Sequence, residues 1–211
     1  MSTQSTQQSG QDTTSDTTAE SADTTAKAGS TRERLLDTVA ALSYRDGVGI
    51  GVEALCKTAG VSKRSMYQLF SSKDEMLAAS LERRAAKPSG LAAPEETPLS
   101  PRERIMYVFE SAEEQVIAPD YRGCPYLAVQ VELKDTEHPA SQVAARVKRE
   151  LQSYFAEQAR QGGAADPELV GRQLILVFDG ASARAGIRAD SLHGGLASTM
   201  VSTLLDAAGV H

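Results

Sequence analysis

The sequence has few of the residues on which stapled or metal-bound folds depend. It contains two cysteines, Cys56 and Cys124, and no tryptophan, and aromatic residues make up only 5% of the chain. Two cysteines are too few for a disulfide scaffold, and they form no metal-ligand spacing with His138, His193 and His211. We therefore expect no disulfide framework, no structural metal site and no cofactor.

Long apolar runs and catalytic motifs are also missing. No run approaches the roughly 20 residues of a membrane span, and the N-terminus has no apolar signal core, so we expect a cytoplasmic protein. The chain has no phosphate-binding glycine loop and no nucleophile elbow. Asp179, Arg184, Glu113 and Glu114 have no partner at a spacing that suggests acid–base chemistry. The sequence therefore predicts no enzyme and no catalytic site.

An overall excess of positive charge, which a nucleic-acid partner would favour, is absent because the net charge is -6. The charge is nevertheless unevenly distributed. Lys and Arg against Asp and Glu number one and four in residues 1–30, ten and seven in residues 31–87, and eleven and seventeen in residues 88–211. Only the middle segment, at +3, favours a polyanion. Because this excess is small, the placement of the charges on a surface must matter more than their total.

Composition divides the chain into four parts. Residues 1–29 are almost wholly small or polar after Met1, which predicts a disordered tail, either a solubilising leader or a regulatory arm. Residues 30–86 and 101–211 show helical periodicity throughout. Residues 87–100, "KPSGLAAPEETPLS", hold three prolines and one glycine and predict a linker or loop. No useful β-type alternation appears, so we expect an all-α protein of two domains.

The N-terminal domain is predicted to begin with a helix capped by Ser30 or Thr31 and ending near Asp46. Two short helices should follow, at about 52–58 and 63–69, and Ser72 with Glu75 resembles the capping box of a fourth. Beyond the linker, further helices are marked by apolar faces and by prolines at their starts. Their predicted apolar members include Ile105, Val108, Phe109, Val129, Leu151, Phe155, Leu174, Val177, Ala181, Leu192, Leu196, Met200 and Leu204.

The stretch from Ala59 to Ser62 predicts a tight turn between two short helices. Gly60 supplies the backbone freedom that the turn needs, and Ser62 can cap the following helix. The outward side chains of that helix are rich in hydrogen-bonding groups: Lys63, Arg64, Ser65, Tyr67 and Gln68. Lys or Arg can donate to guanine and Gln can pair with adenine, as in a helix-turn-helix reader of the major groove. An ordinary helical hairpin with a solvated polar face fits the spacing equally well.

The segment "VEALCKTAGVSKRSMYQLFSSKDEML" resembles the DNA-binding segment of the tetracycline repressor (TetR/AcrR) family. The resemblance covers about residues 31–82 and implies a three-helix DNA-binding domain, followed by a helical ligand-binding and dimerisation domain. It implies that bases are contacted by Ser62, Lys63, Arg64, Ser65 and Gln68, and phosphates by Tyr67 and Lys73. One departure is Ile50-Gly51, where many members have a phosphate-binding Thr. Backbone amides at that helix start could still bind a phosphate.

"GCPYLAVQVEL", "HPA" and "DPELVGRQLILVFDGA" are similar to the C-terminal domain of one branch of the family. This similarity implies a homodimeric regulator, which we expect to be a repressor of a palindromic double-stranded DNA operator, released by a small hydrophobic effector. The candidate pocket residues are Phe109, Tyr126, Gln130, Tyr154 and Phe178, although each also suits a plain core. We expect apolar rows on the last two helices to form the dimer interface. The rows are Leu174, Val177 and Ala181 on one helix and Leu192, Leu196, Met200 and Leu204 on the other.

Two other functions remain open. Cys124 precedes Pro125 at a predicted helix start near Arg122, where a thiolate can be stabilised, so a redox or electrophile sensor is one alternative. A small buried cysteine is the simpler interpretation. An all-α small-molecule-binding protein without DNA activity is the alternative from another class.

Overall fold

A computed structural model describes Met1 and residues 17–87 and 91–211, with the backbone alone for 17–29; residues 2–16 and 88–90 lie outside the described part. The described residues form nine helices and contain no strand, which confirms the all-α prediction. Their bounds are α1 (Thr17–Asp46), α2 (Val52–Ala59), α3 (Lys63–Leu69), α4 (Lys73–Ala85), α5 (Pro101–Val116), α6 (Pro125–Leu133), α7 (Pro139–Gln161), α8 (Pro167–Gly186) and α9 (Leu196–Ala208).

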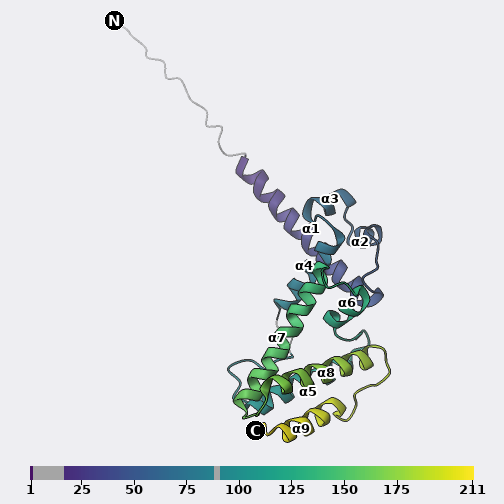
Figure 1. The fold of residues 1–211 in the computed structure, drawn as a ribbon. Coiled ribbons are helices and arrows are strands. Elements are labelled where there is room, and N and C mark those ends of the chain that lie inside the picture. Colours follow the sequence, from purple (N-terminus) through teal and green to yellow (C-terminus); the bar gives the residue numbers. More distant parts are fainter. Residues whose placement is uncertain (2–16, 88–90) are drawn as a thin grey trace.

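Helix α1 begins earlier than the sequence predicted. It starts at Thr17 rather than at Ser30 or Thr31, so it continues into the segment expected to be a disordered tail, and Figure 1 shows this part standing away from the other helices. The added turns extend a helix that is already anchored by its buried second half, so they need no new nucleus. Residues 2–16 of the predicted tail lie outside the described residues.

The first hydrophobic core lies between the helices α1, α2, α3 and α4 and also includes residues of α6 and α7. Leu36, Met66 and Met76 are its fully buried centre. Val129 of α6 and Val143 of α7 belong to the same core, although both lie after the predicted linker. The helices on the two sides of the predicted linker therefore share one core, and α7 runs from this core to the lower helices in Figure 1.

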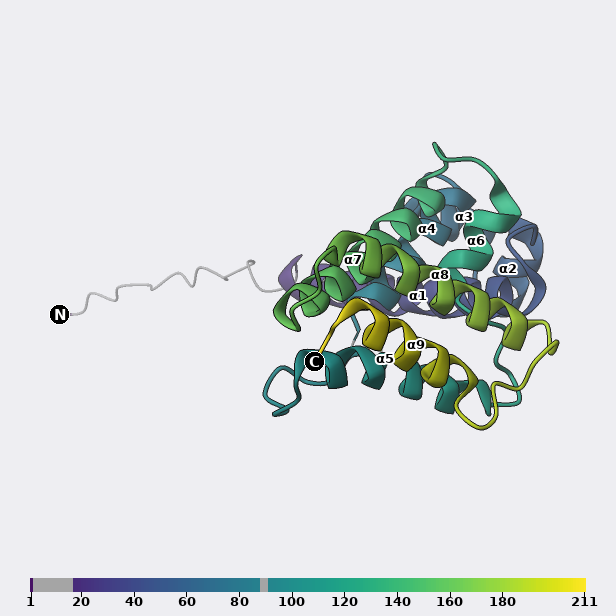
Figure 2. The same cartoon turned by 60° about the horizontal axis from the view of Figure 1, so that its bottom comes forward.

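The second core lies between α5, α7, α8 and α9. Phe109 stacks on Phe155 with ring centroids 5.5 Å apart and meets Phe178 edge-on at 6.1 Å. Figure 2 shows α5 and α9 side by side, in agreement with their packing contacts. Leu174 of α8 is fully buried here, so it cannot belong to the exposed dimer row that the sequence suggested.

The last helix, α9, begins later than predicted: it starts at Leu196, and Leu192 lies in the loop before it. Leu192 is buried in a third small cluster with Val116 and Ala185, and α9 starts only after Gly195. Gly195 has φ 71°, a left-handed conformation that glycine adopts without strain. The predicted row at 192, 196, 200 and 204 is therefore divided between a buried loop residue and the helix proper.

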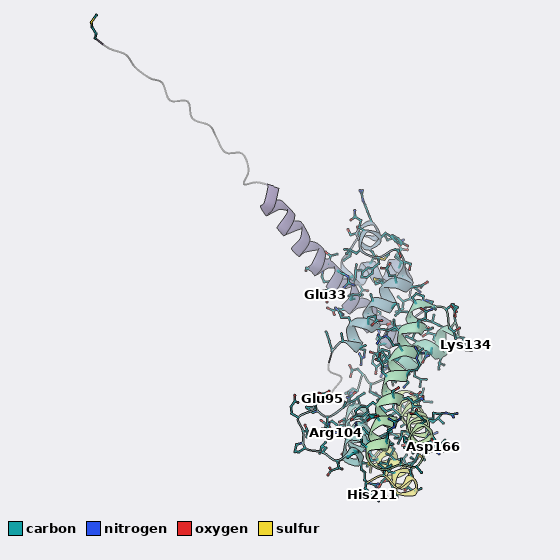
Figure 3. The ribbon with its side chains drawn as sticks, turned by 60° about the vertical axis from the view of Figure 1, so that its left-hand side comes forward. Glu33, Glu95, Arg104, Lys134, Asp166 and His211 are labelled. Carbon is teal, nitrogen blue, oxygen red and sulfur yellow. The ribbon has the colours of Figure 1, made fainter. Side chains whose placement is uncertain are left out.

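Polar side chains cap the starts of α4 and α5 and hold the loop before α5. Ser72 caps α4 by accepting from the Glu75 amide at 3.0 Å, but the Glu75 carboxylate returns to the Ser71 amide at 2.7 Å instead of to Ser72. A complete capping box, not predicted, joins Ser100 and Glu103 at α5. The loop from 91 to 100 is held by the Arg104 guanidinium, which donates to the carbonyls of Glu95 and Thr97. Figure 3 shows where Arg104 and Glu95 lie.

Candidate nucleic-acid interface

The turn between α2 and α3 has the backbone geometry that the sequence predicted. Gly60 has φ 63° and ψ 37°, its amide donates to the Lys57 carbonyl at 3.2 Å, and the Val61 amide donates to the Cys56 carbonyl at 3.0 Å. These two bonds form a Schellman ending, which places a left-handed residue after the helix and favours glycine there. Val61 is buried beneath the turn and fixes the direction in which α3 leaves.

Helix α3 has one buried face and one exposed face. Met66 and Phe70, which follows the helix, are buried in the first core, and Ser62 caps the start by accepting from the Ser65 amide at 3.0 Å. The opposite face, which includes Arg64 and Gln68, is exposed. The first turn of α3 therefore presents donors to solvent from a backbone that the core holds in place.

Several of the predicted DNA-contacting side chains already have partners. The Ser62 and Ser65 hydroxyls lie 2.9 Å apart and hydrogen-bond to each other. Lys63 forms an ion pair with Glu53 of α2 at 3.6 Å, and both side chains are exposed. Tyr67 is 54% exposed, which is unusual for a large aromatic side chain and leaves its hydroxyl accessible to a phosphate.

Lys73 is placed differently from a simple phosphate contact. Its ammonium donates to the Val48 carbonyl at 2.9 Å, and its side chain is partly buried beside the loop between α1 and α2. An ammonium has three donors, so two of them remain available for a phosphate. Lys73 therefore holds this loop in the free protein in addition to any contact it makes with DNA.

The start of α2 matches the departure noted in the sequence. Gly51 is its N-cap and contributes no side-chain hydrogen bond to the first turn. The amides of the first turn can donate to a bound anion, although Glu53 also lies in that turn. Because Lys63 pairs with Glu53, the negative charge next to these amides is partly compensated.

One cation near this surface was missed by the sequence analysis. The Arg32 guanidinium of α1 lies over the Phe70 ring, 5.3 Å from its centroid, just after α3 ends. Arg32 and Phe70 are far apart in the sequence, so no local motif could have paired them. Cys56, by contrast, lies behind the surface, where burial raises the pKa of its thiol.

The five predicted effector residues do not meet in one place. Phe109, Tyr154 and Phe178 contribute to the second core, whereas Tyr126 packs against the first. The Tyr126 hydroxyl lies 3.5 Å from the Leu81 carbonyl of α4, and Gln130 is on the same helix as Tyr126. Burial raises the pKa of both Tyr126 and Tyr154. The structure thus separates the three residues of the second core from Tyr126 and from Gln130, which lie on α6.

A small apolar pocket adjoins Phe109 and Phe178, but Tyr154 does not line it. Its walls include Phe109, Phe178, Tyr121, Glu113 and Leu192, and its free volume is about 10 Å³, close to the space of a single water molecule. Glu113 accepts from the amides of Ala197 and Ser198 at 2.7 and 3.2 Å, so it caps α9. From the sequence, Glu113 was interpreted only as a charge without a partner.

Cys124 is the N-cap of α6 and has a cation beside it. The Lys148 ammonium of α7 lies 3.9 Å from its sulfur, forms an ion pair with Asp179, and sits over the Phe178 ring at 4.8 Å from the centroid. Arg122, which the sequence had suggested as the neighbouring cation, instead donates to the carbonyls of Pro119 and Tyr121. Within the described residues no group of three or more His, Cys, Asp or Glu side chains could hold a metal ion.

Comparison with known proteins places this geometry in a family. The family model for bacterial regulatory proteins of the tetR family matches residues 35–80, which span α2 and α3 and most of α4. The crystal structure of a TetR-type transcriptional regulator from Streptomyces avermitilis MA-4680 is 64% identical, covers 86% of this chain and 99% of its own, and has a TM-score of 0.83. The chain belongs to the TetR family of transcriptional regulators. It is accordingly a DNA-binding regulator and not an enzyme.

Two further TetR-family structures are similar over most of their length. A regulator from Streptomyces coelicolor is 24% identical, with 86% of this chain and 97% of that chain covered and a TM-score of 0.74, which shows the shared fold alone. The reduced form of Escherichia coli NemR is 25% identical, with 82% and 95% covered and a TM-score of 0.72. No curated protein matches the chain. Across its described ranges, this TetR-family chain has no helix long and apolar enough to cross a bilayer.

Proposed function

We propose that this TetR-family regulator is a cytoplasmic homodimeric repressor that binds a palindromic operator and is released by a small hydrophobic effector. The observation that carries the DNA-binding part is the asymmetry of α3. Met66 is fully buried, whereas Lys63, Arg64 and Gln68 are exposed on the other face. A helix held in this way can present donors to base edges without reorganising its backbone.

The dimer is supported by large apolar side chains exposed on α8 and α9 and in the loop that joins them. Leu176 is 73% exposed and Met200 57%. The other large exposed members of this apolar face are Leu169, Ile187 and Leu196. Pairing the two faces across a twofold axis would form a four-helix interface and remove this surface from water. A twofold dimer with two reader helices about 34–36 Å apart binds a palindrome.

Release by an effector is supported by the pocket beside Phe178. At about 10 Å³ it is too small for any effector larger than water, so a ligand must enlarge it. A ligand that prefers such an enlarged conformation shifts the population toward it by its differential affinity for the two conformations. The pocket walls are mainly apolar, which favours a hydrophobic effector.

Selection of bound duplexes from a random pool tests the proposal most directly. The expected result is a palindrome, because a twofold dimer reads two equal half-sites. Recovery of a single half-site would contradict dimeric recognition. If no sequence is enriched while hydrophobic ligands still raise the melting temperature, the chain would be a small-molecule-binding protein without DNA activity.

A second candidate function is a thiol sensor based on Cys124, because the Lys148 ammonium lies 3.9 Å from its sulfur. The structure of NemR, one of the similar proteins, is that of its reduced form. An electrophilic alkene would add to the sulfur, forming a carbon–sulfur bond while the alkene carbon takes up a proton. The proposed consequence is release of DNA after alkylation.

Treatment with N-ethylmaleimide distinguishes the two modes of release. A thiol sensor should release DNA on treatment, and Cys124→Ser should remain bound. Cys56→Ser is the matched control, because Cys56 is buried within the DNA-binding helices. Equal responses of wild type and Cys124→Ser would remove the thiol sensor from consideration.

A further inference from the structure

The loop between α1 and α2, residues 47–51, is held by a side chain from α6. One carboxylate oxygen of Glu132 accepts from the Val48 amide at 2.8 Å and from the Gly49 amide at 3.3 Å. Two consecutive backbone amides thus share one charged acceptor, and such bonds are about twice as strong as neutral ones. The contact crosses from the C-terminal helices to the DNA-binding helices.

The same loop is held from its other side by α4. The Lys73 ammonium donates to the Val48 carbonyl at 2.9 Å, so both backbone polar groups of Val48 are bound by side chains of opposite charge. The Val48 side chain is buried in the first core. Val48 is therefore held by three sets of contacts: the core contacts of its side chain, the hydrogen bond from Lys73 of α4 and the hydrogen bond to Glu132 of α6.

Gly47 shows how closely Glu132 approaches the backbone. Its φ is 92°, and a Cβ added at this position would lie 2.8 Å from a carboxylate oxygen of Glu132. Gly49, two residues later, has open space around the corresponding position. Both positions are glycines, but only at Gly47 would a side chain collide with the Glu132 carboxylate.

The held loop leads directly to the start of α2. Gly51 follows Gly49 by two residues and supplies no side-chain cap, so the first-turn amides of α2 are positioned by the core contacts of the helix and by the backbone before it. These amides are the ones that could donate to a DNA phosphate at the start of α2. A shift of α6 that withdraws Glu132 would loosen that backbone without touching α3.

We propose that Glu132 is a positioning residue that sets DNA affinity by holding the start of α2 in its DNA-binding arrangement. This role rests on the proposed function, since it concerns the same DNA surface. Other contacts across the interface act elsewhere: His138 meets Asp74 at 3.3 Å and Arg146 meets Glu82 at 2.5 Å, and both of these partners lie on α4. Glu132 is the α6 side chain that reaches the loop before α2.

Charge alone predicts the opposite effect for the same mutation. Removing a carboxylate from a protein that binds a polyanion should strengthen binding, because repulsion is reduced. Loss of positioning should weaken binding, because a smaller fraction of molecules has the competent arrangement. The sign of the change therefore distinguishes the positioning role from general electrostatics.

The experiment compares wild type with Glu132→Ala, Glu132→Gln and the matched control Glu110→Gln, an exposed carboxylate on α5. Affinity for the duplex selected by wild type is measured by fluorescence anisotropy at fixed salt. Glu132→Ala should bind about three- to tenfold more weakly. Glu132→Gln, which keeps an acceptor oxygen, should fall between Ala and wild type. Glu110→Gln should bind as wild type or slightly more tightly.

Amide hydrogen exchange on the free proteins supplies a readout that does not depend on DNA. Exchange at Val48 and Gly49 should become faster in Glu132→Ala, while exchange in the second core and the melting temperature stay close to wild type. Unchanged exchange at these two amides, or binding by both Glu132 variants as tight as wild type or tighter, would overturn the positioning role. Equal acceleration of exchange throughout the protein would show a general structural role and overturn it too. Failure of wild type to select any duplex would instead count against the proposed function.

Discussion

The exposed apolar face of α8 and α9 gives a prediction whose size follows from the structure. Complete burial of a leucine side chain contributes about 2 kcal/mol, and Leu176 is 73% exposed in one protomer. Burying that remainder is therefore worth about 1.5 kcal/mol per protomer. In a twofold dimer each residue occurs twice, so Leu176→Ala should cost about 3 kcal/mol, or about a hundredfold in the dimer dissociation constant. Leu176→Glu should cost more, because it also buries a charge.

Sedimentation velocity over a range of concentrations measures this change. The matched control is Val131→Glu, since Val131 is 60% exposed and lies on α6 rather than on α8 or α9. The control should remain a dimer with the wild-type dissociation constant. If Leu176→Glu stays dimeric at wild-type concentrations while Val131→Glu dissociates, the dimer uses another surface and the reasoning from exposure is wrong.

The other predictions concern DNA recognition, coupling and acid stability. Gln68→Ala should relax preference at one operator position by about 1–3 kcal/mol, measured by selection and competition binding; unchanged preference would mean that Gln68 does not contact a base. Gly47→Ala should lower DNA affinity and melting temperature more than Gly49→Ala, because only Gly47 combines a positive φ with the close Glu132 carboxylate; equal losses would contradict this reasoning. Phe178→Ala should weaken effector-driven release but keep operator binding, whereas Tyr126→Ala, which loses a contact with α4, should alter affinity even without effector. The Ser71 hydroxyl and amide lower the pKa of Glu75, so its stabilising effect is present above the unfolded carboxyl pKa and is lost as the pH falls below about 4; Glu75→Gln should flatten this part of an acid-unfolding curve, and an unchanged curve would exclude the effect.

The sequence was most informative where the decisive interactions are local. Gly60, Ser62 and the alternation between Met66 and its exposed neighbours lie within a few residues of one another, so turn chemistry and helical periodicity were enough to predict α2 and α3. The boundary of α1 was less predictable. Propensity is a weak guide where a polar segment continues an anchored helix, and Thr17 as its start has no strong local signal.

Partners that are distant in sequence could not be inferred from single residues. Tyr126 and Phe178 both suit an aromatic pocket, but only the tertiary packing assigns Tyr126 to the first core and Phe178 to the second. The same limit applies to Leu174, whose helical spacing fits an interface or a core equally well. Periodicity identifies the apolar side of a helix but does not say which neighbour covers it.

Glu113 and Glu132 show why charged residues were the hardest to interpret. Each accepts from two consecutive backbone amides of a glycine-containing segment without a side-chain cap: Glu113 at the start of α9, and Glu132 before α2. Both roles are missed from local spacing, because the backbone amides that the two carboxylates bind, and the Ser198 hydroxyl that also donates to Glu113, lie far along the chain. Glu113 also lines the pocket beside Phe178, so a ligand that enlarges this pocket would disturb the start of α9 and the apolar face that carries Met200. The two carboxylates thus tie the proposed dimer surface and the proposed DNA surface to the C-terminal helices, and an effector that moves those helices can change either surface without contacting it.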